Sequence, residues 1–400
     1  METGEMLGGL YKKSTYIEQY RKEHGPIIVV DSGDLLNEYI EIKESIQSSA
    51  RLKADLIVRT YQNIGIDAIN VGELDLALGL DYLKVLEKTY DIPFVSANLV
   101  DETNSPIFKP YVIKEISGRK IGIFGLMGDT SDMVDKLKEI SGGKILVMDL
   151  IQSAESVVKE LKGKVDVIIA MTHHQMGRNW VVARRVPDID LIVGGHHKQK
   201  LKKPYKAGNT FIVQSGEKGQ YQGMLEITFA SGGTRTAENE LVPLGPDISD
   251  DPRVKAMIDQ YNDKVTSLYS LTDEEEVEAV LASQTCAACH SEEFSIWQAS
   301  DHARAFETLA KKSRQFNPDC LACHTTRFEQ DGGFTMELQQ PELRNVQCDA
   351  CHGDSTMHLK DAESLPEQKP DKLLCVKCHT PDRCPYFEEN YQEEWRKIKH

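Results

Sequence analysis

A five-residue pattern, Cys-x-x-Cys-His, occurs four times near the end of this 400-residue chain and limits what that region can fold into. Two thiols at this spacing can each form a thioether with one vinyl group of a haem, and the adjacent imidazole can then bind the iron. A single copy of so short a pattern carries little weight, whereas four copies predict a segment built around c-type haem. The copies are CAACH at 286–290, CLACH at 320–324, CDACH at 348–352 and CVKCH at 375–379.

Structural zinc and disulfide bonds are the alternatives for paired cysteines. Zinc sites often use Cys-x-x-Cys units, but they do not require a His directly after each second Cys, and all four units here have one. We therefore predict four covalently bound haem c groups. The predicted attachment residues are Cys286, Cys289, Cys320, Cys323, Cys348, Cys351, Cys375 and Cys378, and the predicted proximal ligands are His290, His324, His352 and His379.

A second axial ligand is needed for each six-coordinate haem, so the remaining histidines can be counted. Of the 12 histidines in the chain, four belong to the motifs and five lie far upstream, at positions 24, 173, 174, 196 and 197. Three are left near the motifs, namely His302, His358 and His400. Four haem groups thus share three local histidines, and one iron lacks a distal partner of this kind.

The spacing of these residues resembles the cytochrome c554 type of tetrahaem protein. CAACH is followed by FSIWQASDHARAFETL, NPDCLACH, GGF, VQCDACHGDSTMH and CVKCH, and the likeness spans residues 284–400. The resemblance implies that His302, His358 and His400 are distal haem ligands. It also implies that the haem on His324 has no distal His. The fallback ligands for that iron are Met336, Met357 and Cys384.

The region before residue 246 has a different pattern, in which short aliphatic runs alternate with longer amphipathic stretches. Strands of buried parallel sheets form such runs, and amphipathic helices connect them. The alternation predicts an α/β layered fold. The predicted strands are 27–30, 68–71, 94–97, 121–126, 165–170, 189–193 and 211–214, and the predicted helices are 10–24, 50–64, 79–90 and 150–162.

Carboxylates and imidazoles follow several of the predicted strands. Because parallel strands end at one edge of a sheet, such side chains can converge there on a ligand or a metal ion. Taken singly, an Asp after a strand is most often a turn former or a helix cap, so the group matters more than any one member. The residues concerned are Asp34, Glu73, Asp75, His173, His174, His196 and His197.

Eight stretches of the same region carry a family likeness. They are GGLYKKSTYI, VVDSGDLL, NIGIDAINVGELDLALG, IPFVSANL, KIGIFGL, VIIAMTHH, IDLIVGGHH and FIVQSGEKGQYQG. In this order they resemble the calcineurin-like metallophosphoesterases, and in particular their 5'-nucleotidase branch. The resemblance covers residues 8–230 and implies a layered metallophosphoesterase-like sandwich.

The resemblance assigns roles to some residues, and the chain departs from it at others. Asp34 stands where the family has the Asp that bridges two metal ions, and His173 and His196 match two histidine ligands of the second ion. The family's Gly-Asn-His-Glu is replaced, with Glu73 at the Asn ligand and Leu74 at the His that protonates the leaving group. A Leu side chain cannot transfer a proton.

Ligands of the family's first metal ion are missing. The opening Asp-x-His motif is absent, and Lys198 replaces the second His of Gly-His-x-His. Hydrolysis by two metal ions needs both of them to clamp the attacking and leaving oxygens. The sequence therefore favours a retired, structural domain, and the alternative that it leaves open is a residual site for one ion, Zn, Mn or Fe. Its expected ligands are Asp34, Glu73, His173 and His196.

These patterns divide the chain into three predicted segments. Residues 1–245 are predicted to form a 5'-nucleotidase-like domain that lacks its first strand, and residues 284–400 a small, mainly helical tetrahaem cytochrome c domain. Between them, 246–283 is predicted to be a linker helix that starts at Pro252 and is followed by the acidic run TDEEEVEAV.

Charge and chemistry limit the partners and the compartment. The formal net charge of −16 argues against nucleic acid or an anionic membrane as the main partner. No run approaches the roughly 20 apolar residues of a membrane helix, and no signal peptide is visible. Covalent haem attachment in bacteria takes place outside the cytoplasmic membrane, so we expect an exported protein, periplasmic or extracellular. The sequence is then expected to begin downstream of the true start or to have been processed.

Electron transfer is the function that these features favour, with redox proteins or other cytochromes as partners, as a single chain or in a larger assembly. The degenerate N-terminal domain would then be a scaffold or docking module. Two alternatives stay open. One is a metal-dependent phosphoester hydrolase with an accessory cytochrome, and the other is redox catalysis at an open haem.

Overall fold

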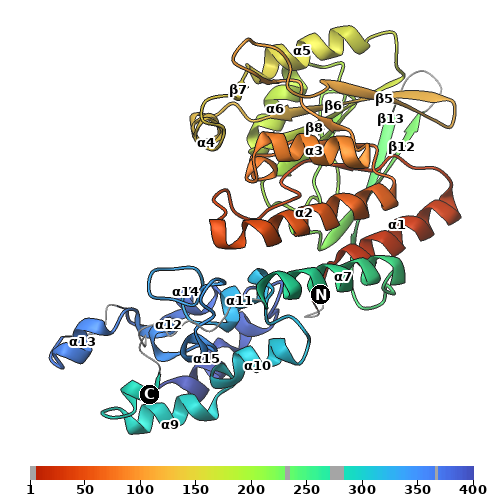
Figure 1. Cartoon of the computed structure of the whole chain (residues 1–400). Helices are drawn as coiled ribbons and strands as arrows, with labels where there is room; N and C mark the ends of the chain where they lie inside the picture. Colours follow the sequence, from red (N-terminus) through yellow and green to blue (C-terminus); the bar gives the residue numbers. More distant parts are fainter. Residues whose placement is uncertain (1–5, 230–234, 271–282, 365–367) are drawn as a thin grey trace. The chain divides into compact units, whose positions relative to one another are not determined.

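The chain forms two compact units (Figure 1). The N-terminal unit contains Leu7–Ile42 and Lys53–Ala256, and the C-terminal unit contains Lys43–Leu52 and Met257–His400. The computed structural model describes residues 6–229, 235–270, 283–364 and 368–400.

A six-stranded sheet forms the centre of the N-terminal unit, with the strand order β10-β11-β9-β8-β6-β5. Its four inner strands are parallel, and an antiparallel strand lies at each edge. Every residue of β8 is buried, as expected for a parallel strand that is covered on both faces. The strands are β5 (Tyr111–Ile116), β6 (Arg119–Met127), β8 (Val167–His174), β9 (Leu191–His196), β10 (Tyr205–Ala207) and β11 (Thr210–Val213).

Two helices cover one face of this sheet. α5 (Leu150–Leu161) begins at the N-cap residue Asp149, whose side chain accepts a hydrogen bond of 2.8 Å from the Gln152 N–H. The buried side chains of α5 recur at the three- and four-residue spacing of an amphipathic helix. Together with α6 (Met176–Arg185) they pack on Phe124 and its neighbours to form an apolar core.

A second layer of strands packs on the opposite face of the sheet. Apolar side chains from both layers meet there in one core, which includes Ile169 and Met171 of β8. The predicted α/β layered sandwich is therefore confirmed. The second layer consists of the parallel strands β1 (Val30–Asp31), β2 (Ala68–Asn70) and β3 (Phe94–Val95) and of the antiparallel hairpin β12 (Tyr221–Phe229) and β13 (Arg235–Pro243).

The other elements of the first 150 residues connect these layers. No described helix of the chain is both long enough and apolar enough to cross a membrane. The connecting elements are α1 (Leu10–His24), α2 (Glu44–Ile64), the 3-10 turn η1 (Leu74–Leu76), α3 (Leu80–Tyr90), the antiparallel pair β4 (Leu99–Val100) and β7 (Leu146–Val147), and α4 (Ser131–Ser141).

Helices make up the C-terminal unit, most of them short, and its described residues after 283 contain no β-strand. A small apolar core includes Leu321, Phe334 and Met336. The prediction of a mainly helical C-terminal domain is confirmed, while the acidic run at 272–280 lies outside the described residues. The elements are α7 (Pro252–Tyr269), α8 (Ser283–Cys286), α9 (Ser291–Ala299), η2 (Asp301–Arg304), α10 (Ala305–Ala310), α11 (Pro318–His324), η3 (Pro341–Leu343), α12 (Cys348–His352), α13 (Thr356–Lys360), α14 (Lys372–Cys375) and α15 (Phe387–Ile398).

Gly125 on β6 marks the close approach of the two strand layers. A Cβ at this position would overlap the Asn70 side-chain oxygen and the Val95 carbonyl oxygen, so we expect Gly125→Ala to lower the free energy of unfolding by about 1–3 kcal/mol. Gly177 on α6 has open space where its Cβ would lie, and Gly177→Ala should raise that free energy by up to about 1 kcal/mol. Denaturant unfolding followed by circular dichroism measures both, and equal stabilities would contradict this packing.

Candidate functional sites

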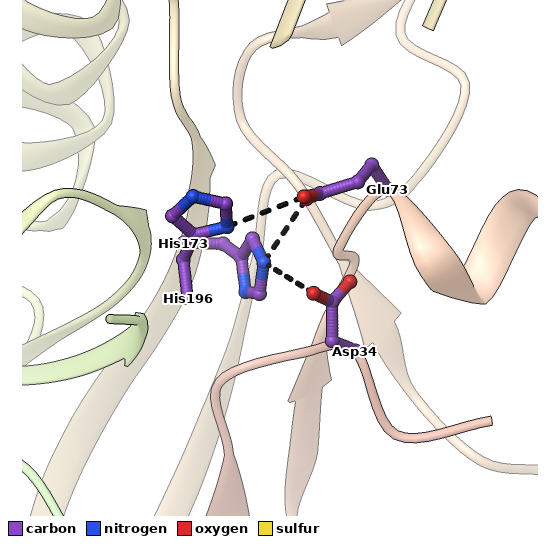
Figure 2. Close-up of side chains that lie close together, drawn as sticks. All are labelled: Asp34, Glu73, His173 and His196. Atoms are coloured by element: carbon purple, nitrogen blue, oxygen red, sulfur yellow. Dashed lines mark ion pairs between the residues drawn. The ribbon is translucent and has the colours of Figure 1, made fainter. Parts of the chain in front are cut away.

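Four side chains with metal-binding atoms converge at the carboxyl ends of the parallel strands (Figure 2). Asp34 follows β1, and Glu73 follows β2. His173 lies near the end of β8, and His196 ends β9. The sheet register pairs His173 with Gly195, so the two histidines reach the same edge. Folding thus brings together the four residues that the sequence predicts as a residual metal site, and metal binding itself stays a prediction.

The ligand atoms of this cluster all lie within 4.8 Å of one another. His173 Nε2 is 3.0 Å from Asp34 Oδ2 and 3.1 Å from Glu73 Oε2. His196 Nδ1 is 3.2 Å from Glu73 Oε1, so Glu73 contacts both imidazoles. Asp34 and His196 keep part of their side chains exposed, and the cluster can therefore be reached from solvent.

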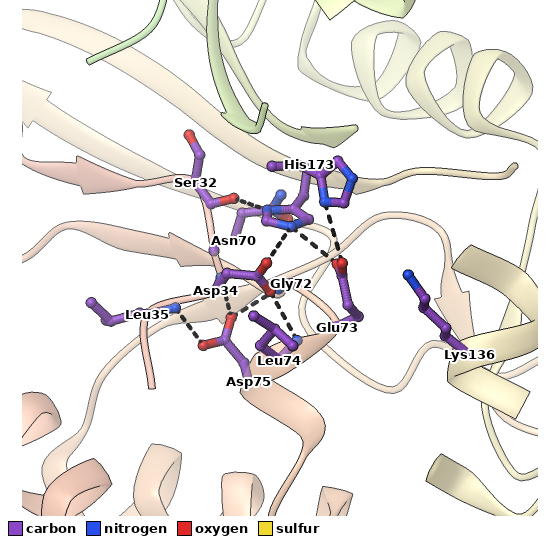
Figure 3. Close-up of polar contacts among 12 residues, drawn as sticks. Ser32, Asp34, Leu35, Asn70, Gly72, Glu73, Leu74, Asp75, Lys136 and His173 are labelled. Carbon is purple, nitrogen blue, oxygen red and sulfur yellow. Dashed lines mark hydrogen bonds and ion pairs between the residues drawn. The ribbon is translucent and has the colours of Figure 1, made fainter. Parts of the chain in front are cut away.

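The hydrogen bonding of His173 tests whether this cluster fits a cation. Its Nδ1 lies 2.8 Å from the Ser32 carbonyl oxygen, which can only accept, so Nδ1 carries a proton and donates it (Figure 3). In the neutral ring, Nε2 then directs a lone pair at two carboxylates. Both Nε2 and Glu73 Oε2 are buried without a well-directed hydrogen bond. A proton on Nε2 or a metal ion among these atoms would remove the repulsion, so the residues present fit a cation.

The pKa values of the cluster follow from the same contacts. Burial alone would lower the pKa of His173, but the adjacent carboxylates of Asp34 and Glu73 outweigh burial and raise this pKa well above its usual range. Burial would raise the pKa of Glu73, but its contacts with His173 and His196 outweigh burial and lower the pKa. The cluster therefore keeps Glu73 ionised and attracts positive charge.

Two of the four residues in the cluster, Asp34 and His196, have a strained backbone conformation. Asp34 and His196 have φ angles of 57° and 61°, in the left-handed region that residues with a Cβ seldom adopt. Strain of this kind gathers at functional sites. A Cβ on Gly195 would lie 2.7 Å from the Ser32 carbonyl oxygen, and one on Gly72 would lie 2.5 Å from the Asp34 nitrogen. Glycine at both positions lets the loops approach closely enough to bring the side chains together.

Several polar residues that follow strands lie outside the cluster. Lys198, which replaces a metal ligand of the family, is exposed and pairs with Glu217 at 2.9 Å. His174 faces away from His173 because side chains alternate along a strand, and His197 is exposed. Among the residues that the structure describes, no other group of three or more acidic, His or Cys side chains comes close enough to hold a metal ion.

Two supporting groups could not be recognised from residue type. The Ser32 carbonyl oxygen orients His173, and a backbone oxygen leaves no signal in the sequence. The pattern at the strand ends groups Asp75 with the metal ligands, but its carboxylate accepts hydrogen bonds from backbone N–H groups instead (Figure 3). Burial and the nearby Asp34 carboxylate raise the pKa of Asp75 to about 7.

Histidine pairs face one another in the C-terminal unit. Two imidazoles that share one iron need roughly 6 Å between their ring centres, because each metal–nitrogen bond is about 2 Å long. Each pair combines a motif histidine with one of the three remaining local histidines, so the residues present fit three six-coordinate haem groups. The ring centres are 5.9 Å apart for His290 and His358, 6.0 Å for His302 and His379, and 5.6 Å for His352 and His400.

His324 of the second motif has different neighbours, and no imidazole of the described residues faces it in this way. Its Nδ1 lies 2.7 Å from the Ala305 carbonyl oxygen and 3.2 Å from Thr308 Oγ1. Of the fallback ligands, Met336 is fully buried in the apolar core, and Met357 is 65% exposed. The absence of a distal histidine at this haem stays a prediction.

The geometry defines a chain of two parts, a metallophosphoesterase-like sandwich and a c-type cytochrome segment. Residues 285–353 match the family model described as "Cytochrome c554 and c-prime". The "Cytochrome c-554" of Nitrosomonas europaea is 30% identical over 140 residues, which cover 28% of this chain and 60% of that protein.

The N-terminal unit is similar to 5'-nucleotidases. The "5'-nucleotidase" of Vibrio cholerae serotype O1 is 28% identical over 270 residues, which cover 59% of this chain and 48% of that protein. The solved structure of the Thermus thermophilus sulfate thiohydrolase SoxB matches with a TM-score of 0.57 at 19% identity, covers 64% of this chain and 47% of its own, and shows likeness of fold alone. The chain spans about half the length, or less, of the first 5'-nucleotidase-type relatives. It therefore joins a 5'-nucleotidase-like metallophosphoesterase domain to a cytochrome c554-like segment.

Burial of His174 makes the stability of the N-terminal unit depend on pH. Its side chain is buried, its Nε2 has no partner, and desolvation lowers its pKa to about 4. The unfolded state takes up a proton below a pH of about 6.5, while the folded state keeps His174 neutral, so stability is lost as the pH falls from about 6.5 to 4. We expect this loss to be smaller in His174→Gln by roughly 2–3 kcal/mol between pH 7 and 4.5. Denaturant unfolding at both pH values measures it, and parallel losses would contradict the assignment.

Proposed function

We propose that this chain is an exported multihaem c-type cytochrome that transfers electrons, with its N-terminal unit as a scaffold or docking module. The observation that carries the proposal is that each remaining local histidine faces a motif histidine. Ligation by two histidines gives iron suited to passing single electrons. The partners would be redox proteins or other cytochromes.

Contacts between cysteines of different motifs support close spacing of the haem groups. Their thiols are near enough to share a hydrogen bond or to influence one another's charge. Haem groups attached at these cysteines would form a row. The haem of the first motif would lie beside that of the third, the third beside the fourth, and the fourth beside the second, so the haem on His324 would lie at one end. Cys286 can share a hydrogen bond with Cys348, and Cys323 with Cys378, while Cys351 and Cys375 are near enough to influence one another's charge.

For the N-terminal unit we propose one bound divalent ion without two-metal hydrolysis. Asp34, Glu73, His173 and His196 would hold the ion, which would supply Lewis-acid charge. Two-metal hydrolysis needs a second ion, but the described residues provide one ligand group. Leu74 also stands at the position of the family's proton donor. Both departures favour a domain that retains the fold and has lost the reaction.

The arrangement of the histidines predicts how many haem groups bind an added ligand. In the reduced holoprotein we expect carbon monoxide to bind one haem in four, because only the iron on His324 lacks a distal imidazole. His302→Ala should raise this to two in four by opening the haem on His379. His24→Ala, which changes a histidine of α1, is the matched control and should leave one in four. Optical titration counts the reactive haem groups.

The same preparation tests electron transfer. Reduction of all four haem groups by a low-potential donor, followed by reoxidation by a second c-type cytochrome, is the expected result. A holoprotein that cannot pass electrons to any acceptor cytochrome would refute the proposed function. Four unreactive low-spin haem groups would instead refute only the open site on His324.

Metal analysis tests the proposal for the N-terminal unit. We expect one divalent ion per chain besides the haem iron, and a loss of affinity of at least about tenfold in Asp34→Ala. Asp101→Ala, which removes a turn carboxylate outside the cluster, should bind the ion as the wild type does. No phosphomonoester or cyclic-diester turnover is expected in any of the three proteins. Turnover that depends on Asp34 would show an active hydrolase with an accessory cytochrome.

A further inference from the structure

Asp75 is a buried carboxylate that no family motif identifies as a metal ligand. It lies on η1, directly after the loop that carries Glu73, and only 1% of its surface is exposed. Its carboxylate accepts hydrogen bonds from four backbone N–H groups, and Figure 3 shows those of Asp34, Leu35 and Gly72 beside it. The donors are Asp34 at 2.9 Å, Leu35 at 2.8 Å, Leu36 at 3.1 Å and Gly72 at 2.8 Å.

These donors come from two separate loops. Asp34 and the two residues after it belong to the loop after β1, whereas Gly72 precedes Glu73 in the loop after β2. One carboxylate therefore joins the two loops from which the acidic members of the metal cluster project. Hydrogen bonds that backbone N–H groups donate to a carboxylate are among the stronger ones in proteins.

The link between the loops is reciprocal. The Leu74 N–H donates to Asp34 Oδ1 at 2.8 Å, so the Asp34 carboxylate holds the second loop while Asp75 holds the first. This leaves Asp34 Oδ2 as the oxygen that faces His173 Nε2, at 3.0 Å. The orientation of the Asp34 carboxylate is thus determined by a backbone donor on the loop that Asp75 secures.

The Asp34 backbone needs such support. Its φ of 57° is unfavourable for a residue with a Cβ, and the preceding Gly33 has a φ of 94°. A strained conformation persists only where surrounding contacts determine it. The three consecutive N–H groups of residues 34–36 all donate to Asp75, which is the contact that holds this turn.

We infer that Asp75 is a positioning residue, which holds the loops of Asp34 and Glu73 at the separation that one metal ion requires before the ion binds. The inference rests on the proposed metal site for its functional meaning, although the link itself exists without an ion. The Asp75 carboxylate binds backbone N–H groups, and it acts on the cluster through Asp34.

The first test is Asp75→Asn in the full-length holoprotein. The amide has nearly the same shape, but its NH2 group cannot accept, so it would face N–H donors and lose part of the four-bond link. We expect the affinity for Mn²⁺, titrated as the added ion, to fall by about 10–100-fold. The Mn²⁺ paramagnetic resonance spectrum should also broaden, because the ligands are less well held.

Asp101→Asn is the matched control. Asp101 Oδ1 also accepts hydrogen bonds from two backbone N–H groups, those of Thr103 at 2.8 Å and Ser105 at 2.9 Å, but it lies in a turn outside the cluster. The same chemical change there should leave the Mn²⁺ affinity and spectrum unaltered. Equal affinities in Asp75→Asn and the wild type would overturn the inference.

Amide hydrogen exchange of the metal-free wild type tests the link without a substitution. We expect the amides of Leu35, Leu36 and Gly72 to be as well protected without Mn²⁺ as with it. If they exchange as fast as exposed turn amides until Mn²⁺ binds, the ion and not Asp75 organises the loops, and the inference fails. If the wild type binds no Mn²⁺ but these amides are protected, the metal site fails while the link stands.

Exchange in Asp75→Asn separates positioning from general stability. Faster exchange at residues 34–36 and 72, with unchanged protection along β8, is the expected result. Loss of protection along β8 as well would show that Asp75 supports the whole unit, which would overturn a specific positioning role.

Discussion

The parallel alignment of β6, β8 and β9 is the constraint on which the N-terminal site depends. It brings the carboxyl ends of the strands to one edge, so that imidazoles of β8 and β9 meet carboxylates from the loops after β1 and β2. This arrangement places several buried hydrogen-bond acceptors opposite one another, which is energetically unfavourable. Backbone N–H groups satisfy the Asp75 carboxylate, whereas the proton that Ser32 holds on His173 Nδ1 leaves the Nε2 lone pair directed at the carboxylates of the cluster. At the centre of the cluster, acceptor atoms still face one another without a donor between them, and a cation fits there.

The two parts of the chain depend on different sources of order. The N-terminal unit has two continuous apolar cores on either side of its large sheet. The C-terminal unit consists of short helices with a small core, and a domain of this size needs additional support, which covalently held porphyrins would supply. The packing of the layers does not depend on Lys198, which is exposed and pairs with Glu217. Fold and function are separable there for that reason.

Sequence patterns predicted most of the elements whose signal is local. The predicted helix 10–24 coincides with α1, and 150–162 differs from α5 by one residue. The strand predicted to end at 170 continues to His174, because backbone pairing with β9 and not apolar character decides where β8 ends. The hairpin of β12 and β13 was not predicted. β13 and the second half of β12 alternate between partly buried and exposed residues, and neither strand contains a long aliphatic run that would mark it as a buried strand.

The sequence by itself predicted the attachment chemistry, because both thiols and the proximal histidine that each haem would need lie within five consecutive residues. It also identified the three remaining local histidines and the four residues of the metal cluster, since their types and positions match family motifs. Only the tertiary structure decided that His358 faces His290, that His302 faces His379 and that His400 faces His352. It also showed that Asp75, although it is close in sequence to Glu73, binds backbone N–H groups and does not join the metal-binding cluster. These are contacts between residues far apart in the chain or with backbone atoms, and residue type does not encode either.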